Sequence, residues 1–314
     1  MNTSNQPTAS APFPKESSPT GAFRRQVSAF RDWVTTDGSS DFPAASGRYH
    51  LYVSSACPWA HRAIIARKLK GLEGVISMTI VDPIRDEKGW AFTDAPDPIE
   101  GFRYLEQAYL QTDPTFEGRV TVPVLWDKLS RRVVNNESSE ILRMLNSAFD
   151  AFTTSKIDLY PEPLRDEIDT LNDLIYGAVN NGVYRAGFAT TPEAYQAAVT
   201  PLFEALEELE LRLEHRRFLL GPEPTEADWR LFTTLVRFDS VYFGHFKCNL
   251  KSIESMPNLW GYLRDLYQQP GVAETVDMDH IKRHYYETHL TINPTGIVPV
   301  GPDLDFLSPH GRQS

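Results

Sequence analysis

Cysteine is scarce in this chain, with two residues among 314. Two thiols cannot build a disulfide framework, so we expect a protein of the reducing cytoplasm. Basic residues are also in short supply, because 31 Lys and Arg face 42 Asp and Glu and give a formal net charge of −11. Binding to phosphate backbones depends on clustered Lys and Arg, so we expect no nucleic-acid partner.

Long apolar runs are missing as well. None approaches the roughly 20 residues that a membrane helix needs, and we therefore expect no membrane partner. The N-terminus has no apolar core of a signal peptide. Its first 20 or so residues are rich in Ser, Thr, Pro and Asn, and residues 1–45 are expected to form a flexible extension.

The remaining chain divides into two regions of different character. Over residues 46–148 the pattern is strand, helix, strand, helix, two short strands and a helix. This order predicts a thioredoxin-like domain, with parallel strands joined by a helix, then a hairpin and a closing helix. Residues 163–290 carry apolar side chains at helical spacing and predict an all-helical domain. Residues 291–314 are expected to form an extended tail, so the fold class is α/β plus all-α.

One of the two cysteines, Cys57 in "SSACPWAH", stands between a predicted strand and a predicted helix. Helix N-termini offer unpaired N–H groups and the positive end of the macrodipole, which stabilise a thiolate. The alternative is a small buried side chain, the usual state of a lone cysteine. The position favours a nucleophile that works without a second thiol, since a Cys-x-x-Cys motif would need cysteine at Ala60. Cys248 has no such position and is interpreted as structural.

Two further features suggest ligand binding. Pro123 interrupts the strand-like run "TVPVLW", where a cis bond after Val122 would turn the backbone toward a ligand, or the run is simply an edge strand. Glu137 and Ser138 begin a predicted helix. They could hold the ammonium and carboxylate groups of an amino acid, although serine there is commonly just a cap.

The helical region supplies tyrosines, of which Tyr184, Tyr242, Tyr285 and Tyr286 stand out. Aromatic residues at helical spacing are most often core. Phenols close to a cysteine could instead donate a hydrogen bond or a proton. The residues alone leave both possibilities open.

Other polar residues are assigned to folding or packing. Thr225 and Asp228 have the spacing of a capping box, with Asp in the place of Glu, and we assign them to folding. His280 and His284 are four residues apart, but no companion ligands accompany them, so we expect no metal site.

Several short sequence blocks, taken together and in their order along the chain, indicate which protein family this chain resembles. They are "CPWAHR", "GW", "TVPVLWD", "NNESSEI", "NGVYRAGFA", "FKCN", "HYYETH" and "INPTG". From about Arg24 to Pro302 the chain resembles the Xi-class glutathione transferases, the glutathionyl-hydroquinone reductases. The resemblance implies a thioredoxin-like domain followed by the all-helical C-terminal domain of glutathione transferases, in a homodimer.

The resemblance also implies an activity and a set of site residues. Family members reduce S-glutathionyl-hydroquinones, consuming glutathione as a co-substrate and holding no bound cofactor. The carried-over roles place Cys57 as nucleophile, Tyr184 as proton donor or acceptor, and Tyr242 and Tyr285 as supports of the thiolate and of the substrate hydroxyls. The implied glutathione-binding residues are Trp90, Arg119, Val120, Thr121, Val122, Glu137 and Ser138. The alternatives are an omega-like thiol transferase or dehydroascorbate reductase and a non-catalytic scaffold.

Overall fold

The computed structural model describes residues 16–312, and its first domain is built on a four-stranded sheet. The strands are β3 (Tyr49–Val53), β4 (Ser77–Ile80), β5 (Val124–Asp127) and β6 (Arg132–Asn135), in the spatial order β4-β3-β5-β6. Strand β3 runs parallel to β4 and antiparallel to β5, with Leu51 opposite Met78 on one side and Leu125 on the other. This mixed sheet confirms the predicted thioredoxin-like topology.

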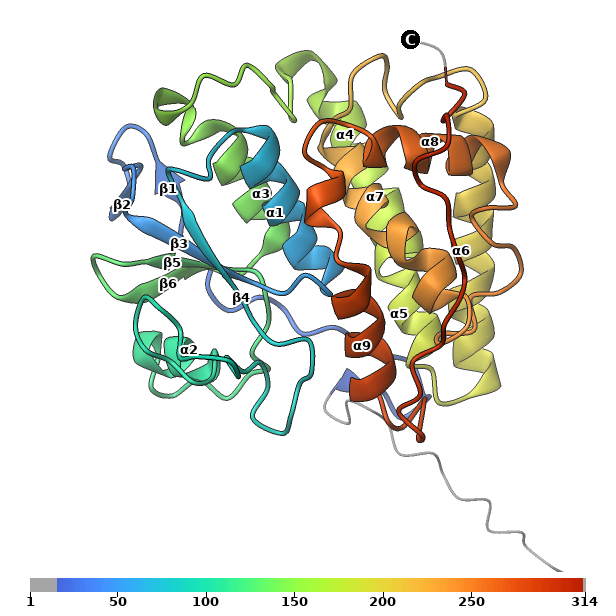
Figure 1. Ribbon diagram of the computed structural model, residues 1–314, viewed down its shortest axis with the longest axis horizontal. Helices are drawn as coiled ribbons and strands as arrows, with labels where there is room; N and C mark the ends of the chain where they lie inside the picture. Colours follow the sequence, from blue (N-terminus) through green and yellow to red (C-terminus); the bar gives the residue numbers. More distant parts are fainter. Residues whose placement is uncertain (1–15, 313–314) are drawn as a thin grey trace, which may run out of the picture.

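Three helices cover this sheet. They are α1 (Pro58–Leu69), α2 (Glu106–Thr112) and α3 (Ser138–Ser147). Figure 1 shows α1 and α3 on the side of the sheet that faces the helical domain, and α2 on the other side. The start of α1, which carries Cys57, therefore lies at the boundary between the domains.

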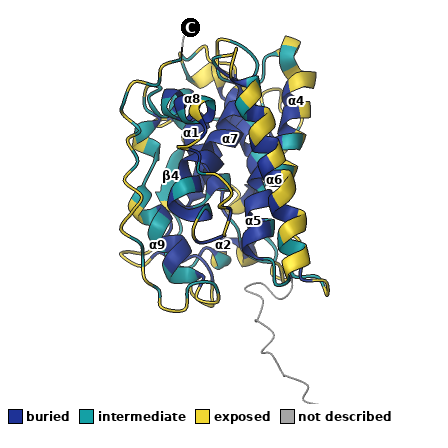
Figure 2. Ribbon diagram, turned by 90° about the vertical axis from the view of Figure 1, so that its right-hand side faces the viewer, coloured by how far each residue is buried: buried dark blue, intermediate teal, exposed yellow. Residues whose placement is uncertain are grey.

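The second domain is helical, as the apolar spacing predicts. Its α-helices are α4 (Arg165–Leu174), α5 (Gly182–Gly187), α6 (Pro192–Arg212), α7 (Glu226–Arg237), α8 (Pro257–Tyr267) and α9 (Met278–Thr288). π-Helical turns η4 (Ile175–Asn180) and η5 (Phe238–Tyr242) continue α4 and α7, and short 3₁₀ turns are η2 (Asp150–Phe152), η3 (Glu162–Leu164) and η6 (Ala273–Thr275). Helix α7 is buried along its whole length and lies at the centre of the domain (Figure 2).

The start of α7 has the hydrogen bonds that its sequence spacing predicts. The Thr225 N–H and hydroxyl donate to Oδ2 of Asp228 at 2.7 and 3.0 Å. The Tyr262 hydroxyl and the Leu219 N–H each donate to Oδ1 at 2.9 Å. Burial raises the pKa of the Asp228 carboxyl, and these donors offset part of that cost. Thr225 and Asp228 thus lie within the core of the helical domain, away from the pocket described below.

The structure of the two ends of the chain can be compared with the predicted flexible N-terminal extension and the predicted extended C-terminal tail. Residues 16–45 are not a free extension, because β1 (Val34–Thr35) and β2 (Phe42–Pro43) pair in parallel and the preceding segment crosses between the domains. In that segment the Gly21 carbonyl accepts the Thr190 N–H of the helical domain at 3.1 Å. The expectation for residues 1–15 lies outside the described residues. The C-terminal tail runs as irregular chain along the helical domain (Figure 1).

Candidate active site

Cys57 lies at the N-cap of α1, where its backbone is extended with φ −81° and ψ 121°. Its thiol is partly exposed and lies 3.7 Å from the carbonyl oxygen of Val122, to which it can donate. Cys248 is fully buried in the helical domain, and burial raises the pKa of its thiol. Of the two thiols, Cys57 is therefore the one available for chemistry.

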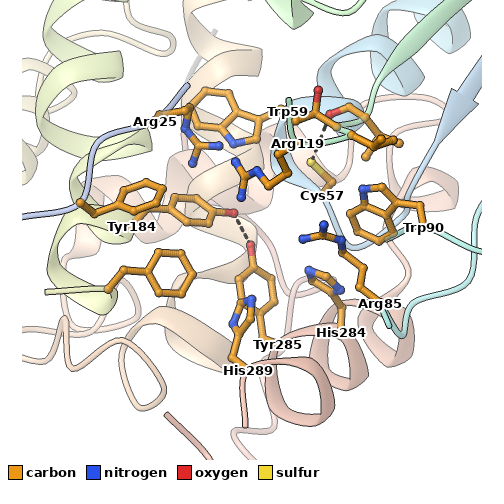
Figure 3. A pocket seen from close by; sticks show the side chains of 15 residues that line it. Arg25, Cys57, Trp59, Arg85, Trp90, Arg119, Tyr184, His284, Tyr285 and His289 are labelled. Atoms are coloured by element: carbon orange, nitrogen blue, oxygen red, sulfur yellow. Dashed lines mark hydrogen bonds between the residues drawn. The ribbon is translucent and has the colours of Figure 1, made fainter. Parts of the chain in front are cut away.

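The Cys57 side chain lines a pocket between the two domains (Figure 3). Arginines and aromatic rings make up most of its wall. The lining residues are Phe23, Arg25, Cys57, Trp59, Arg85, Trp90, Arg119, Val120, Thr121, Val122, Tyr184, Phe188, His284, Tyr285 and His289. The pocket thus combines a thiol, positive charge and flat apolar surfaces.

Three arginines bring that positive charge. Arg85 and Arg119 line the pocket together with Cys57, and both interact electrostatically with it. Burial lowers the pKa of Arg85 to about 10, which still leaves the guanidinium charged at neutral pH. The guanidinium of Arg25 lies 4.8 Å from the ring centres of Trp59 and Tyr184. These cation–π contacts fix a third charge in the wall of the same pocket.

The predicted tyrosines form one hydrogen-bonded cluster. The Tyr285 hydroxyl lies 2.5 Å from the hydroxyl of Tyr184 and 3.0 Å from that of Tyr242. Tyr184 and Tyr285 line the pocket, and Tyr242 is buried behind Tyr285. The neighbouring Tyr286 points elsewhere, since its hydroxyl donates to the Ser240 carbonyl at 3.2 Å.

Burial governs the protonation of this cluster. It raises the pKa of Tyr184, and it raises the pKa values of Tyr242 and Tyr285 well above their ordinary range. All three phenols are therefore neutral near pH 7 and can act as hydrogen-bond or proton donors.

The residues expected to bind glutathione lie along this pocket and a second one that adjoins it. Trp90 and the 119–122 segment line the first pocket, and Glu137 and Ser138 line the second together with Val122 and Pro123. The Val122–Pro123 bond is cis, as the sequence suggested, and the ladder of β5 begins at Val124. The two pockets share Arg25, Trp59, Arg119, Thr121 and Val122, so one ligand can extend through both.

Glu137 occupies the N-cap of α3. Its carboxylate accepts the Ser139 N–H at 3.1 Å and the Ser28 hydroxyl at 2.9 Å. Burial opposes ionisation, yet these hydrogen bonds and the charge of Arg62 hold the pKa of Glu137 below its ordinary value. A charged carboxylate beside the Ser138 hydroxyl is a suitable partner for an ammonium group.

Several pocket residues were not foreseen. They are Phe23, Arg25, Trp59, Arg85, Phe188, His284 and His289. Arg25 lies in a segment expected to be flexible, whereas Arg85 stands only five residues before Trp90, one of the residues that the family resemblance implies for glutathione binding. His284 stacks on Trp90 with ring centres 5.0 Å apart, and burial lowers its pKa to about 3. Within residues 16–312, no group of three or more His, Cys, Asp or Glu could hold a metal ion.

No helix of the described part of the chain is long and apolar enough to cross a membrane. The pocket beside Cys57 is lined by residues of both domains and of the segment around Arg25.

Comparison with known proteins assigns both domains. The glutathione S-transferase N-terminal domain matches residues 56–148, and the glutathione S-transferase C-terminal domain matches residues 192–265. The glutathionyl-hydroquinone reductase YqjG of Escherichia coli (strain K12) is 54% identical over 303 residues, which cover 93% of this chain and 92% of the relative. The reductase PcpF of Sphingobium chlorophenolicum is 51% identical and covers 90% of each chain.

Solved structures agree. The glutathione-bound structure of YqjG superimposes with a TM-score of 0.88 and covers 90% of this chain and 95% of its own. The glutathione S-transferase Xi of Phanerochaete chrysosporium, 49% identical, gives 0.89 and covers 91% and 95%. With this identity over nearly the whole length, the chain belongs to the Xi-class glutathione transferases, the family of the glutathionyl-hydroquinone reductases.

Proposed function

We propose that this protein reduces S-glutathionyl-hydroquinones to hydroquinones, with glutathione as its co-substrate. The observation that carries the proposal is the placement of Cys57 between two sets of groups. On one side lie the predicted glutathione-binding residues, and on the other lies the neutral Tyr184–Tyr285 pair. The names of the relatives YqjG and PcpF support the same reaction.

In the first step the Cys57 thiolate attacks the glutathione sulfur of the substrate. A sulfur–sulfur bond forms, and the carbon–sulfur bond breaks with its electron pair leaving on the ring carbon. Tyr184 gives that carbon a proton, with Tyr285 as its hydrogen-bond partner. The products are free hydroquinone and a Cys57–glutathione mixed disulfide.

In the second step a new glutathione opens the mixed disulfide. Its thiolate attacks the bound glutathione sulfur, oxidised glutathione leaves, and the Cys57 thiolate is restored. The proton lost by the attacking thiol returns to Tyr184, so the cycle balances. One protein thiol suffices because the resolving thiol comes from solution, which explains Ala60 at the fourth position of "CPWA".

The main rival is an omega-like thiol transferase acting on mixed disulfides or dehydroascorbate. It would use the same Cys57, but a disulfide already has a good leaving group and needs little proton donation. The neutral, hydrogen-bonded tyrosines beside the thiol favour a substrate that must expel carbon. A scaffold without catalytic activity would have no use for a partly exposed thiol next to two arginines.

The proposal is tested by turnover of a glutathionyl-hydroquinone and of a glutathionylated peptide by the same preparation. We expect the hydroquinone to be the better substrate, and Cys57→Ser to abolish its turnover, because a serine hydroxyl is almost wholly protonated near neutral pH. Glutathione binding, measured by calorimetry, should remain. Cys248→Ala is the matched control and should keep its activity. Full activity in Cys57→Ser, or reduction of the peptide alone, would contradict the proposal.

The family resemblance further supports a homodimer that works in the cytoplasm. Light scattering should then give twice the 35.6 kDa mass of the chain. A monomer at micromolar concentration would speak against the dimer.

A further inference from the structure

Arg237, the last residue of α7, is fully buried and reaches across the domain boundary. Its Nη2 donates to the Ser55 carbonyl at 2.8 Å, and its Nε donates to the Ala56 carbonyl at 2.9 Å. These two carbonyls belong to the turn that immediately precedes Cys57. A guanidinium of the helical domain therefore holds the backbone that presents the thiol of the other domain.

The remaining contacts of Arg237 are also with neutral groups. Its Nη1 donates to the Thr233 carbonyl at 2.7 Å and contacts Nδ1 of His61 at 3.0 Å. Burial, with the charge of Arg237, lowers the pKa of His61 well below its ordinary value, so the ring is neutral and Nδ1 accepts. Its Nε2 then donates to the Thr275 hydroxyl at 2.8 Å.

This charge has no carboxylate partner within ion-pair distance among residues 16–312. A buried charge without a counter-ion is costly, and packing alone would be served as well by an apolar side chain. The same charge acts electrostatically on Tyr242 and Tyr285, where it favours the anionic form. It thus opposes the effect of burial on the phenols beside the pocket.

We propose that Arg237 is a positioning residue of the reductase. It holds the Ser55–Ala56 turn so that Cys57 faces the pocket. Its fixed positive charge also acts on Tyr285, the hydrogen-bond partner of Tyr184, which shares the negative charge left when Tyr184 gives up its proton. This inference rests on the proposed function for the second role only. The first concerns the reactivity of Cys57 with any electrophile.

The test compares Arg237→Gln and Arg237→Lys in the full-length protein. Three quantities are measured: the alkylation rate of Cys57 by iodoacetamide at fixed pH, and kcat and KM for a glutathionyl-hydroquinone and for a small glutathione mixed disulfide. Misplacement of a reacting group by about 1 Å can cost on the order of 100-fold. We therefore expect Arg237→Gln to slow alkylation and to lower kcat for both substrates by about 10-fold or more. KM for either substrate should change less than kcat.

The lysine variant separates geometry from charge. Lysine keeps the charge but lacks the planar guanidinium that donates to the Ser55 and Ala56 carbonyls at once. Alkylation should therefore be slowed in Arg237→Lys as in Arg237→Gln. The ratio of hydroquinone to disulfide turnover should fall in Arg237→Gln and recover in Arg237→Lys.

Arg230→Gln is the matched control, because Arg230 is a buried arginine of the same helix that pairs with Glu226. It should cost stability without slowing the alkylation of Cys57. Equal alkylation rates in Arg237→Gln, Arg230→Gln and the parent would overturn the positioning role. If Arg237→Gln fails to fold, the lysine variant decides, since parental alkylation in that variant overturns the proposal. If alkylation slows but the parent does not reduce the hydroquinone, the proposed function fails and the positioning of Cys57 stands.

Discussion

At the scale of single residues, the position of a side chain could be predicted where it depends on local order along the chain. The place of Cys57 between a strand and a helix follows from "LYVSSACPW", and the N-cap geometry agrees with it. The residues alone leave the choice between Tyr285, which the family resemblance implies, and Tyr286 open, because it depends on the rotation of α9 against α5 and η5. That rotation turns Tyr285 toward Tyr184 and Tyr286 toward Ser240.

Removing the Tyr184 hydroxyl should separate the two classes of substrate. Expelling a ring carbon benefits from a proton delivered in place, and general-acid help of this kind is typically worth about 100- to 10,000-fold. Tyr184→Phe should therefore lower kcat for a glutathionyl-hydroquinone by about 100-fold or more, and lower reduction of a small mixed disulfide much less. Both rates are measured on one preparation with saturating glutathione.

Tyr286→Phe is the control for that experiment, since its hydroxyl bonds to the Ser240 carbonyl and does not line the pocket. It should leave the ratio of the two rates unchanged. Equal losses on both substrates in Tyr184→Phe would assign Tyr184 to packing or glutathione binding, and another proton donor would be needed.

At the scale of elements, the strands and helices follow their patterns closely, but the segment of residues 16–30 does not. Its polar composition is that of a flexible chain, yet the Gln26 side chain pairs with the backbone of Arg119 as a neighbouring strand would. The Gln26 amide donates to the Arg119 carbonyl at 2.6 Å and accepts the Arg119 N–H at 2.9 Å. Pairing by a side chain leaves no periodic signal in the sequence, which is why this part of the site was missed.

Gln26→Ala should weaken glutathione binding, because the 119–122 backbone that Gln26 holds lines both pockets. Each hydrogen bond contributes a net of about 1 kcal/mol, so losing two should raise KM for glutathione by about 3- to 30-fold, with a smaller effect on kcat. Steady-state kinetics with varied glutathione measure this.

A matched control is Gln268→Ala, which also removes two hydrogen bonds between a side-chain amide and the backbone. The Gln268 amide donates both of them, to the carbonyls of Phe306 and Ser308 in the C-terminal tail. KM for glutathione should be unchanged in that variant. A KM that is unchanged in both would show that the segment does not support the glutathione site.

The β5–β6 hairpin should be sensitive to acid through Asp127. Its buried carboxylate accepts Nε and Nη2 of Arg48 at 2.8 and 2.6 Å and the Ser130 hydroxyl at 2.6 Å. Burial opposes ionisation, yet these partners lower the pKa of Asp127 to about 2. Since this folded pKa lies below the unfolded one, the stabilisation is present above about pH 4 and is lost as pH falls toward 2.

Asp127→Asn should therefore lower the free energy of unfolding by about 2 kcal/mol at pH 7 and flatten its dependence on pH between 4 and 2. Urea unfolding at several pH values measures both effects. Asp303→Asn, in the exposed tail, is the control and should change neither. If the free energy of unfolding of Asp127→Asn still fell as steeply between pH 4 and 2 as that of the parent, other carboxylates would be responsible for the acid sensitivity.

At the scale of the whole molecule, the two domains could be predicted from the order of strands and helices and the spacing of apolar residues along the chain, but the interface between the domains could not. Contacts between domains are made by residues far apart in the sequence, such as Arg143 of α3 and Glu226 at the start of α7. Arg143 Nη2 lies 2.9 Å from Oε1 of the fully buried Glu226 and also pairs with Asp169 of α4. In the sequence these residues are ordinary charged positions on predicted helices, and no pattern indicates that they contact each other across the domain interface.

Arg143→Met should show how far this ion pair couples the domains. Removing one partner of a buried pair leaves the other charge poorly compensated, which costs about 3–5 kcal/mol in full burial. Arg143 is partly exposed and Arg230 still contacts Glu226 at 3.5 Å, so we expect a loss of about 2–3 kcal/mol in urea unfolding. The double variant Arg143→Met with Glu226→Gln should recover part of it, since no buried charge is then stranded. A double variant no more stable than Arg143→Met would mean that the arginine acts by packing over Tyr160, whose ring centre lies 3.9 Å from the guanidinium carbon.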